Sequence, residues 1–381
     1  MTKPLVIGLA LAFGVLLQSE AHARSAALQC LADLDDAKAF ISVNDAGADL
    51  MLADHGGAIA QAYEAARLGA AQAEDDETCF RLLENYLRAW RTGHLGVART
   101  LQDTALGPAA RLDAHAENDP RLPRLQSLDT KTLVLTLPSF LEPYGPVVRR
   151  FLDQQRPILE SHRYWIIDVR DNEGGSDSTF EPLLPWLLDG EMRTQSVEYL
   201  ATPANIKAQG DICSFVDDAA TCREAMAPTV EAMKRVPAGT FVHIGAKVLV
   251  QHLESEPHHP ERVVVLTDRS CASSCEQFVL EARGAPRVKI LGRPTAGMLD
   301  VSNLRPHTLP SGRLLFYATT RSTRLPDMRI DGIGIAPDIL LERPASDAER
   351  LREVKRARKW LEDGSLGVDP DEASRTSSRS R

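Results

Sequence analysis

Residues 263–298 (VVVLTDRSCASSCEQFVLEARGAPRVKILGRPTAGM) constrain the fold of this chain more than any other segment. The β-branched run 263–266 predicts a buried strand, which gives way through the polar residues 268–270 to an amphipathic helix. Two serines, Ser273 and Ser274, lie at this turn. A hydroxyl placed there is close to unpaired N–H groups and to the positive end of the helix dipole, which stabilise a developing oxyanion. Simple helix capping by serine is the alternative interpretation.

A second segment repeats this pattern earlier in the chain. Residues 165–169 (WIIDV) predict another buried strand, which ends in charged residues and in Gly174 and Gly175, before a helix rich in Leu and Trp. Glycine accepts positive φ, so the two glycines let another backbone segment or a substrate carbonyl come close. An ordinary turn would also explain them. Because both turns follow the C-terminal end of a strand, however, we expect them to line one ligand site.

The hydrophobic pattern divides the rest of the chain. Residues 25–105 predict helices, and from residue 133 onward strands and helices alternate, which is typical of a layered α/β core. Ser346 and Glu349 form a capping-box pattern at the start of a last helix. The expected parts are a signal segment (1–23), a helical N-terminal domain plus linker (24–128), an α/β core (129–345), a C-terminal helix (346–363) and a disordered tail (364–381).

Four motifs, in order and at matching spacing, resemble the carboxyl-terminal-processing (tail-specific) serine peptidase family. They are DVRDNEGG at 168–175, CASSCE at 271–276, GRPTAG at 292–297 and GIGIAPD at 332–338. The resemblance extends over about residues 133–340, and agreement of four ordered motifs is hard to obtain by chance.

The resemblance implies a crotonase-like layered core and a peptide or protein substrate. It places the nucleophile at Ser273, with Ser274 as the rival. The backbone N–H of Ser274 and one from the turn Gly174–Gly175 would form the oxyanion hole. Familiar members carry a PDZ module before the core, but the interval between His94 and residue 133 is too short for one. We therefore expect a PDZ-less branch of the family.

The catalytic base is the main departure from the family pattern. A serine needs a neighbour that takes its proton, and the usual lysine position is held here by Met298, whose thioether cannot do so. Lys289 is a weak substitute, because a strand lysine more often points to solvent. His94, in the run RTGHLGV, resembles a D-G-H segment common in these proteins and is the candidate base. A structural loop histidine is the alternative interpretation.

The N-terminus and the charge indicate an exported protein. Lys3, an apolar run of about fourteen residues and an A-x-A site at 21–23 predict a signal peptide cleaved after Ala23, too short to span a membrane. No later segment has membrane-spanning length, so we expect a soluble periplasmic or secreted protein. The formal net charge of −9 argues against nucleic-acid binding.

The six cysteines fit an oxidising compartment. Proximity along the chain favours the pairs Cys30–Cys79, Cys213–Cys222 and Cys271–Cys275, the last of which would clamp the turn that carries Ser273. Zinc binding is the alternative, but the spacings lack C-x-x-C and clustered histidines, so we expect neither a metal nor a cofactor.

These observations favour a secreted serine hydrolase, with peptidase activity through a Ser273 acyl-enzyme as the leading hypothesis. Two alternatives stay open. Met298 in place of the lysine favours a non-catalytic peptide- or ligand-binding protein on a degenerate protease scaffold. An esterase is the other, because an ester needs less protonation of its leaving group than an amide. The sequence makes no prediction of oligomeric state.

Overall fold

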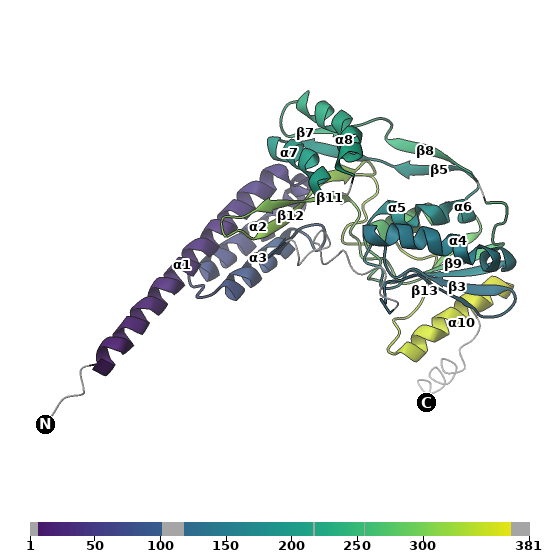
Figure 1. The fold of residues 1–381 in the computed structure, drawn as a ribbon, viewed down its shortest axis with the longest axis horizontal. Coiled ribbons are helices and arrows are strands. Elements are labelled where there is room, and N and C mark those ends of the chain that lie inside the picture. Colours follow the sequence, from purple (N-terminus) through teal and green to yellow (C-terminus); the bar gives the residue numbers. More distant parts are fainter. Residues whose placement is uncertain (1–6, 101–117, 216–217, 255, 367–381) are drawn as a thin grey trace. The chain divides into compact units, whose positions relative to one another are not determined.

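The computed structural model describes residues 7–100, 118–215, 218–254 and 256–366 of the chain. Its contacts divide the chain into two compact units. The helical unit comprises the described residues of Met1–Ala110, Val197–Lys247 and Asp300–Pro326. The sheet unit comprises those of Arg111–Ser196, Val248–Leu299 and Asp327–Arg381. Both are drawn in Figure 1.

A six-stranded sheet forms the centre of the sheet unit, in the order β13-β10-β9-β4-β3-β2. Its strands are β2 (Arg124–Ser127), β3 (Thr132–Thr136), β4 (Tyr164–Asp168), β9 (Arg262–Thr267), β10 (Val288–Gly292) and β13 (Ile339–Leu340). All neighbours pair in parallel except β2, which runs antiparallel to β3 at the edge. Because β4 and β9 are adjacent and parallel, the two turns that follow them lie at the same edge of the sheet.

Helices cover both faces of this sheet, as Figure 1 shows for α4, α5 and α6 on one side and α10 on the other. The helices are α4 (Gly145–Ser161), α5 (Asp177–Phe180), α6 (Leu184–Leu187), α9 (Ser274–Ala282) and α10 (Asp347–Asp363), joined by the 3-10 turns η2 (Glu142–Tyr144) and η3 (Glu181–Leu183). Alternate strand residues divide between the two faces: Trp165 and Val263 belong to the core under α4 and α9, whereas Ile166 and Val264 belong to the core under α10. Burial on both faces explains why these strands are continuously apolar in sequence.

The α/β architecture expected from residue 133 onward is thus confirmed, while the crotonase-like assignment stays a prediction. A separate antiparallel pair, β5 (Gly190–Gln195) and β8 (Val248–Leu253), completes the sheet unit. The last helix is confirmed too, because Ser346 accepts the backbone N–H of Glu349 and caps α10. Most of the expected tail, residues 367–381, lies outside the described residues.

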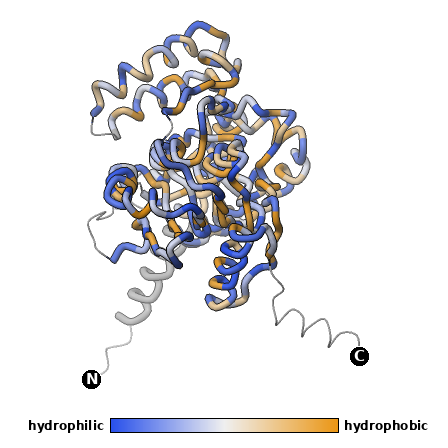
Figure 2. The backbone as a smooth tube through the Cα atoms, turned by 90° about the vertical axis from the view of Figure 1, so that its right-hand side faces the viewer, coloured by the Kyte–Doolittle hydropathy of each residue, from blue (hydrophilic) through white to orange (hydrophobic). Residues whose placement is uncertain are grey.

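The helical unit packs three long helices against a sheet. Its elements are α1 (Ile7–Asn44), α2 (Ala48–Ala70), α3 (Asp76–Trp90), β1 (Gly96–Ala98), β6 (Val197–Ala201), α7 (Pro203–Asp211), η4 (Ile212–Phe215), α8 (Ala219–Lys234), β7 (Thr240–His243), β11 (Val301–Thr308) and β12 (Leu314–Ser322). The sheet runs β1-β12-β6-β7, with β11 also paired to β12. Leu315 of β12 is buried in the same core as Leu34, Leu83 and Trp90 of the helices. Figure 2 shows hydrophilic and hydrophobic residues interleaved along the described part of the chain.

The grouping of residues differs from the continuous core expected over 129–345. Residues 197–247 and 300–326 associate with the N-terminal helices, because β12 pairs with β1 and contributes to the helical core. Residues 1–6 of the expected signal lie outside the described residues, and α1 continues through the expected cleavage position at Ala23. Among the described residues, no helix is long and apolar enough to cross a membrane.

All six cysteines form the three disulfides expected from the sequence. The Cα–Cα distances are 5.5 Å for Cys30–Cys79, 5.5 Å for Cys213–Cys222 and 5.2 Å for Cys271–Cys275. In the part of the chain that the structure describes, no three His, Cys, Asp or Glu side chains are grouped to hold a metal ion.

The Cys30–Cys79 disulfide joins α1 to α3 across a sequence separation of 49 residues, against 9 for Cys213–Cys222. We predict that Cys30→Ala/Cys79→Ala lowers the free energy of unfolding by about 2–5 kcal/mol, because the longer loop loses more entropy on closure. Cys213→Ala/Cys222→Ala in the same unit is the matched control and should cost about 1.5 kcal/mol less. Urea denaturation of the oxidised proteins measures both, and equal losses would contradict the loop-entropy explanation.

Candidate active site

The turn between β9 and α9, called here the serine turn (residues 268–273), holds Ser273 in an unusual conformation. Ser273 is the N-cap of α9 and has φ 56° and ψ −120°. A positive φ is rare for a residue other than glycine, and a strained backbone of this kind costs about 1–3 kcal/mol. The side chain is partly exposed at the start of the helix. The surrounding structure therefore keeps a hydroxyl at a strained turn beside a helix N-terminus.

The glycine turn (residues 171–175) lies directly against the serine turn. Gly174 has φ 89°, and a Cβ atom built on it would lie 2.3 Å from the carbonyl oxygen of Ala272 and 3.0 Å from the backbone nitrogen of Ser274. The backbone N–H of Ala272 also donates to the carbonyl of Asn172 at 3.2 Å. The two turns singled out in the sequence are therefore neighbours, and only glycine permits this approach.

Asn172 fixes the glycine turn, a role that the sequence interpretation missed. Its Oδ1 accepts the N–H of Gly174 at 2.8 Å, and its Nδ2 donates to the carbonyl of Leu137 at 2.9 Å. The side chain is fully buried. An asparagine two residues before a glycine pair is the available sequence signal, because a short amide can bond its own backbone two residues on.

Two backbone donors remain at the junction of the turns. In the described part of the chain, the N–H groups of Gly175 and Ser274 have no hydrogen-bond acceptor. The N–H of Gly174 differs, because it is donated to Asn172. Unpaired N–H groups at a helix start and at a glycine turn are suitable donors for an oxyanion.

The two serines have different surroundings. Ser274 is buried, and its side chain forms a hydrogen bond with the carboxyl of Asp177 at the start of α5. Burial raises the pKa of Asp177, the charge of Glu181 raises it further, and the bond to Ser274 opposes this shift. Ser273 is the more exposed of the two. The surroundings thus favour Ser273 over Ser274 as a reacting hydroxyl.

The carboxylate of Glu276 joins the serine turn to a third loop, called here the threonine turn (residues 293–298). It accepts hydrogen bonds from the N–H of Ser273 at 3.1 Å and the hydroxyl of Thr295 at 2.5 Å, and from the N–H groups of Gly297 and Met298, both at 2.8 Å. Glu276 is fully buried. Met298, at the position where the resemblance expects a lysine, is thus joined to the serine turn through its backbone N–H and Glu276. Its side chain carries a thioether in place of an amine.

His94 belongs to the helical unit, where its ring is held by backbone contacts. Its Nδ1 lies 2.5 Å from the carbonyl oxygen of Val301. Because a carbonyl can only accept, Nδ1 carries the proton and Nε2 carries the lone pair. The pKa of His94 is lowered from 6.5 to about 4, chiefly by burial and also by the charge of Arg91, against the opposing effects of the Val301 bond and Asp45. The imidazole is therefore neutral at neutral pH.

Lys289, the other candidate base, is exposed on β10, as a strand lysine usually is.

Known proteins resemble this chain in sequence pattern and in fold. Residues 131–341, more than half of the chain, match the model of peptidase family S41. The fold is similar to that of mature CPAF, at 14% identity and a TM-score of 0.63 over 90% of this chain and 100% of that one. Mature CPAF complexed with lactacystin gives 14% identity and a TM-score of 0.61 over 88% and 99%.

An inferred peptidase from Parabacteroides merdae ATCC 43184 gives 18% identity and a TM-score of 0.53 over 79% of this chain and 88% of that one. A search of curated proteins finds no match. At these identities the solved structures establish similarity of fold only. The extent of the family match establishes more, and it agrees with the resemblance to the tail-specific peptidases: this chain belongs to peptidase family S41.

Proposed function

We propose that this protein is a serine-type peptidase in which the hydroxyl of Ser273 attacks the carbonyl carbon of a peptide bond. The observation that carries the proposal is the strained backbone of Ser273 at the N-cap of α9, with Gly174 packed against the next backbone nitrogen. Attack forms a bond between Oγ and the carbonyl carbon, and expulsion of the amine leaves an acyl-enzyme that water hydrolyses. Membership of family S41 supports this reaction class.

The oxyanion of the tetrahedral intermediate is assigned to the N–H groups of Ser274 and Gly175. Among the described residues both donors are unpaired, whereas the N–H of Gly174 is already donated to Asn172. The N-terminal end of α9 adds a positive potential at the same point. These donors would act on charge that develops only in the transition state, which is where stabilisation raises the rate.

His94 is the proposed base. Its lowered pKa keeps it neutral, and its tautomer puts the lone pair on Nε2. A neutral imidazole of this kind can take the proton of a serine hydroxyl and return it to the leaving amine. Neither alternative is better suited, because Met298 has no basic nitrogen and Lys289 is exposed.

We also propose that the protein works outside the cytoplasm. Three disulfides, one of them beside Ser273, form and persist in oxidising compartments. Together with the apolar, Lys-led N-terminus, they support export to the periplasm or medium and removal of residues 1–23. The proposed substrate is a peptide or protein.

We predict that Ser273→Ala abolishes covalent labelling by a fluorophosphonate probe and all peptide cleavage, because the attacking oxygen is gone. Ser274→Ala is the matched control: it keeps the backbone N–H and should still be labelled. In-gel fluorescence and intact mass measure both. Labelling of Ser273→Ala at the wild-type rate would refute the assignment, and absence of labelling in the wild type would favour the non-catalytic alternative.

The pH dependence tests His94. A base must be neutral, so kcat/KM should be level at neutral pH and fall as the pH drops through about 4, the lowered pKa of His94. An unperturbed histidine would instead place this fall near pH 6.5. With p-nitrophenyl acetate as substrate, His94→Gln should lower kcat/KM by about 10²–10⁴-fold and remove the acidic limb. A limb that persists in His94→Gln would show that another group is the base.

The close approach of the two turns gives a third prediction. Gly174→Ala would put a Cβ 2.3 Å from the carbonyl oxygen of Ala272, so the glycine turn must move away from Ser274. We expect the rate of fluorophosphonate labelling to fall about a hundredfold or more. Gly190→Ala is the matched control, since Gly190 also has positive φ, 76°, but nothing within 4 Å of its Cβ position. Equal effects of the two substitutions would show that backbone strain alone matters.

A further inference from the structure

The C-terminal helix α10 lies beyond the segment that matches the family model, which ends at residue 341. Its surface is largely charged, yet Glu353 on this helix is only 5% exposed. A carboxylate is seldom buried unless it is paired, so we expect Glu353 to have positively charged or hydrogen-bonding partners.

Glu353 binds two arginines that come from different loops of the site. Its Oε2 accepts a hydrogen bond from Nη1 of Arg170 at 2.6 Å, and its Oε1 accepts one from Nη1 of Arg293. Arg170 is 4% exposed. One carboxylate therefore bridges the loop after β4 and the loop after β10.

Each arginine is close in sequence to a group that shapes the surroundings of Ser273. Arg170 is two residues before Asn172, whose side chain holds the N–H of Gly174. Arg293 is two residues before Thr295, whose hydroxyl donates to Glu276. Arg293 also donates its backbone N–H to the carbonyl of Thr267, at the end of β9, at 3.0 Å. The glycine turn and the threonine turn are thus both anchored to Glu353.

Charges in this network balance. Asp168 pairs with Arg170 through contacts of 2.8 and 2.5 Å, so two carboxylates, Asp168 and Glu353, face two guanidinium groups. Burial would lower the pKa of Arg170, but the bonds and charges of Asp168 and Glu353 outweigh it and the pKa is raised. Loss of Glu353 would leave one buried positive charge uncompensated, which proteins tolerate poorly.

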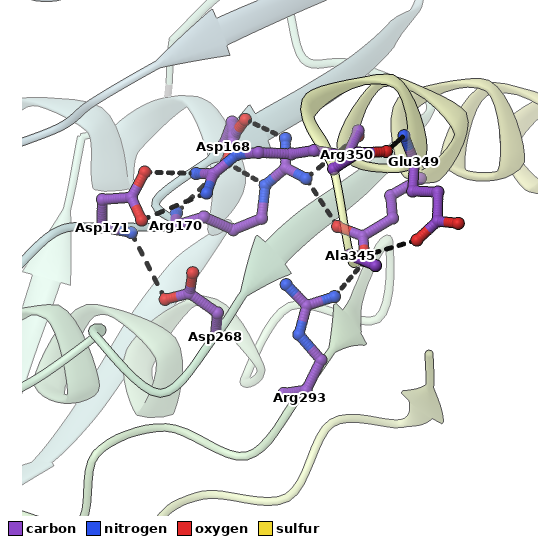
Figure 3. A network of polar contacts seen from close by, with 10 residues as sticks. Asp168, Arg170, Asp171, Asp268, Arg293, Ala345, Glu349 and Arg350 are labelled. Carbon is purple, nitrogen blue, oxygen red and sulfur yellow. Dashed lines mark hydrogen bonds and ion pairs between the residues drawn. The ribbon is translucent and has the colours of Figure 1, made fainter. Parts of the chain in front are cut away.

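A second contact from α10 reaches the serine turn. Arg350 forms a bidentate pair with Asp171, with contacts of 3.1 and 2.5 Å (Figure 3). The backbone N–H of Asp171 donates to Asp268, which also accepts the N–H of Ser270. In Figure 3, dashed lines join Asp171 to Arg350 of the helix and to Asp268 of the serine turn. The helix therefore contacts all three turns, directly or through one residue.

We propose that Glu353 is a positioning residue for the acyl transfer: through Arg170 and Arg293 it sets the glycine turn and the threonine turn at the distance from Ser273 that the reaction needs. It touches no reacting atom. This inference rests on the proposed function, because it assumes that Ser273 is the nucleophile.

The test compares Glu353→Gln with the matched control Glu362→Gln. Glu362 is on the same helix but forms an exposed pair with Arg358. Both are measured with the full chain, at a temperature at which near-UV circular dichroism shows each variant folded. We expect Glu353→Gln to lower the rate constant of fluorophosphonate labelling, and kcat for p-nitrophenyl acetate, by about 10–100-fold with KM within about twofold. Glu362→Gln should match the wild type. A folded Glu353→Gln that reacts at the wild-type rate would overturn the proposal.

The double variant Arg293→Gln/Glu353→Gln separates positioning from stability. It restores the charge balance, so the melting temperature should return towards that of the wild type, but the charged bridge is absent and labelling should stay slow. If Glu353→Gln alone does not fold, the labelling rate of the double variant is measured in its place. Wild-type labelling by the folded double variant would refute the inference. Labelling of Ser273→Ala at the wild-type rate would refute the proposed function, and the inference about Glu353 with it. Labelling of Glu353→Gln at the wild-type rate would refute only the inference.

Discussion

The rest of the site depends on one buried carboxylate, that of Glu276, and on the hydrogen bonds that satisfy it. A buried charge is costly unless donors surround it, and here three backbone N–H groups and one hydroxyl do so. The donors come from both the serine turn and the threonine turn, so neither can move without leaving the charge unpaired. Met298 takes part only through its backbone. This contact is therefore made without the side chain at the position where the resemblance expects a lysine.

Strain at Ser273 has to be maintained by constraints on both sides. The Cys271–Cys275 disulfide spans the residue, with both sulfurs buried in the core. Glu276 holds its N–H, and Gly174 leaves no room for the backbone to relax in the other direction. Strained conformations survive where several independent contacts determine them. Ser273 and Glu276 also form a capping box at the start of α9. Three contacts that hold a strained residue are nevertheless more than a helix cap needs, since a cap normally adopts an unstrained extended backbone.

The sequence predicted the parts of this arrangement that depend on local pattern. Strands β4 and β9 follow from their apolar runs, and the neighbouring turns follow from the rule that parallel strands end at one edge of the sheet. The disulfide pairs followed from proximity along the chain. The resemblance already placed the nucleophile at Ser273 with Ser274 as the rival, whereas the backbone angle and the Asp177 contact, which support that proposal, are encoded in no pattern. Likewise the assignment of 300–326 to the helical unit depends on pairing between β1 and β12, residues more than two hundred positions apart.

Glu353 shows why a site can extend beyond the motifs that reveal it. In sequence it is one acidic residue in a helix of charged residues, and the hydrophobic periodicity of the helix does not single it out. Its proposed role rests on its burial, and burial depends on where α10 packs on the sheet. The family motifs consist of residues in the turns around the proposed site. Residues that form ion pairs with those turns can lie on any element that packs against them. A parallel sheet is usually covered on both faces, and α10 covers one face of this sheet. Here that helix lies beyond the segment that matches the family model, and its Glu353 supplies the counter-charge to the arginines that follow β4 and β10.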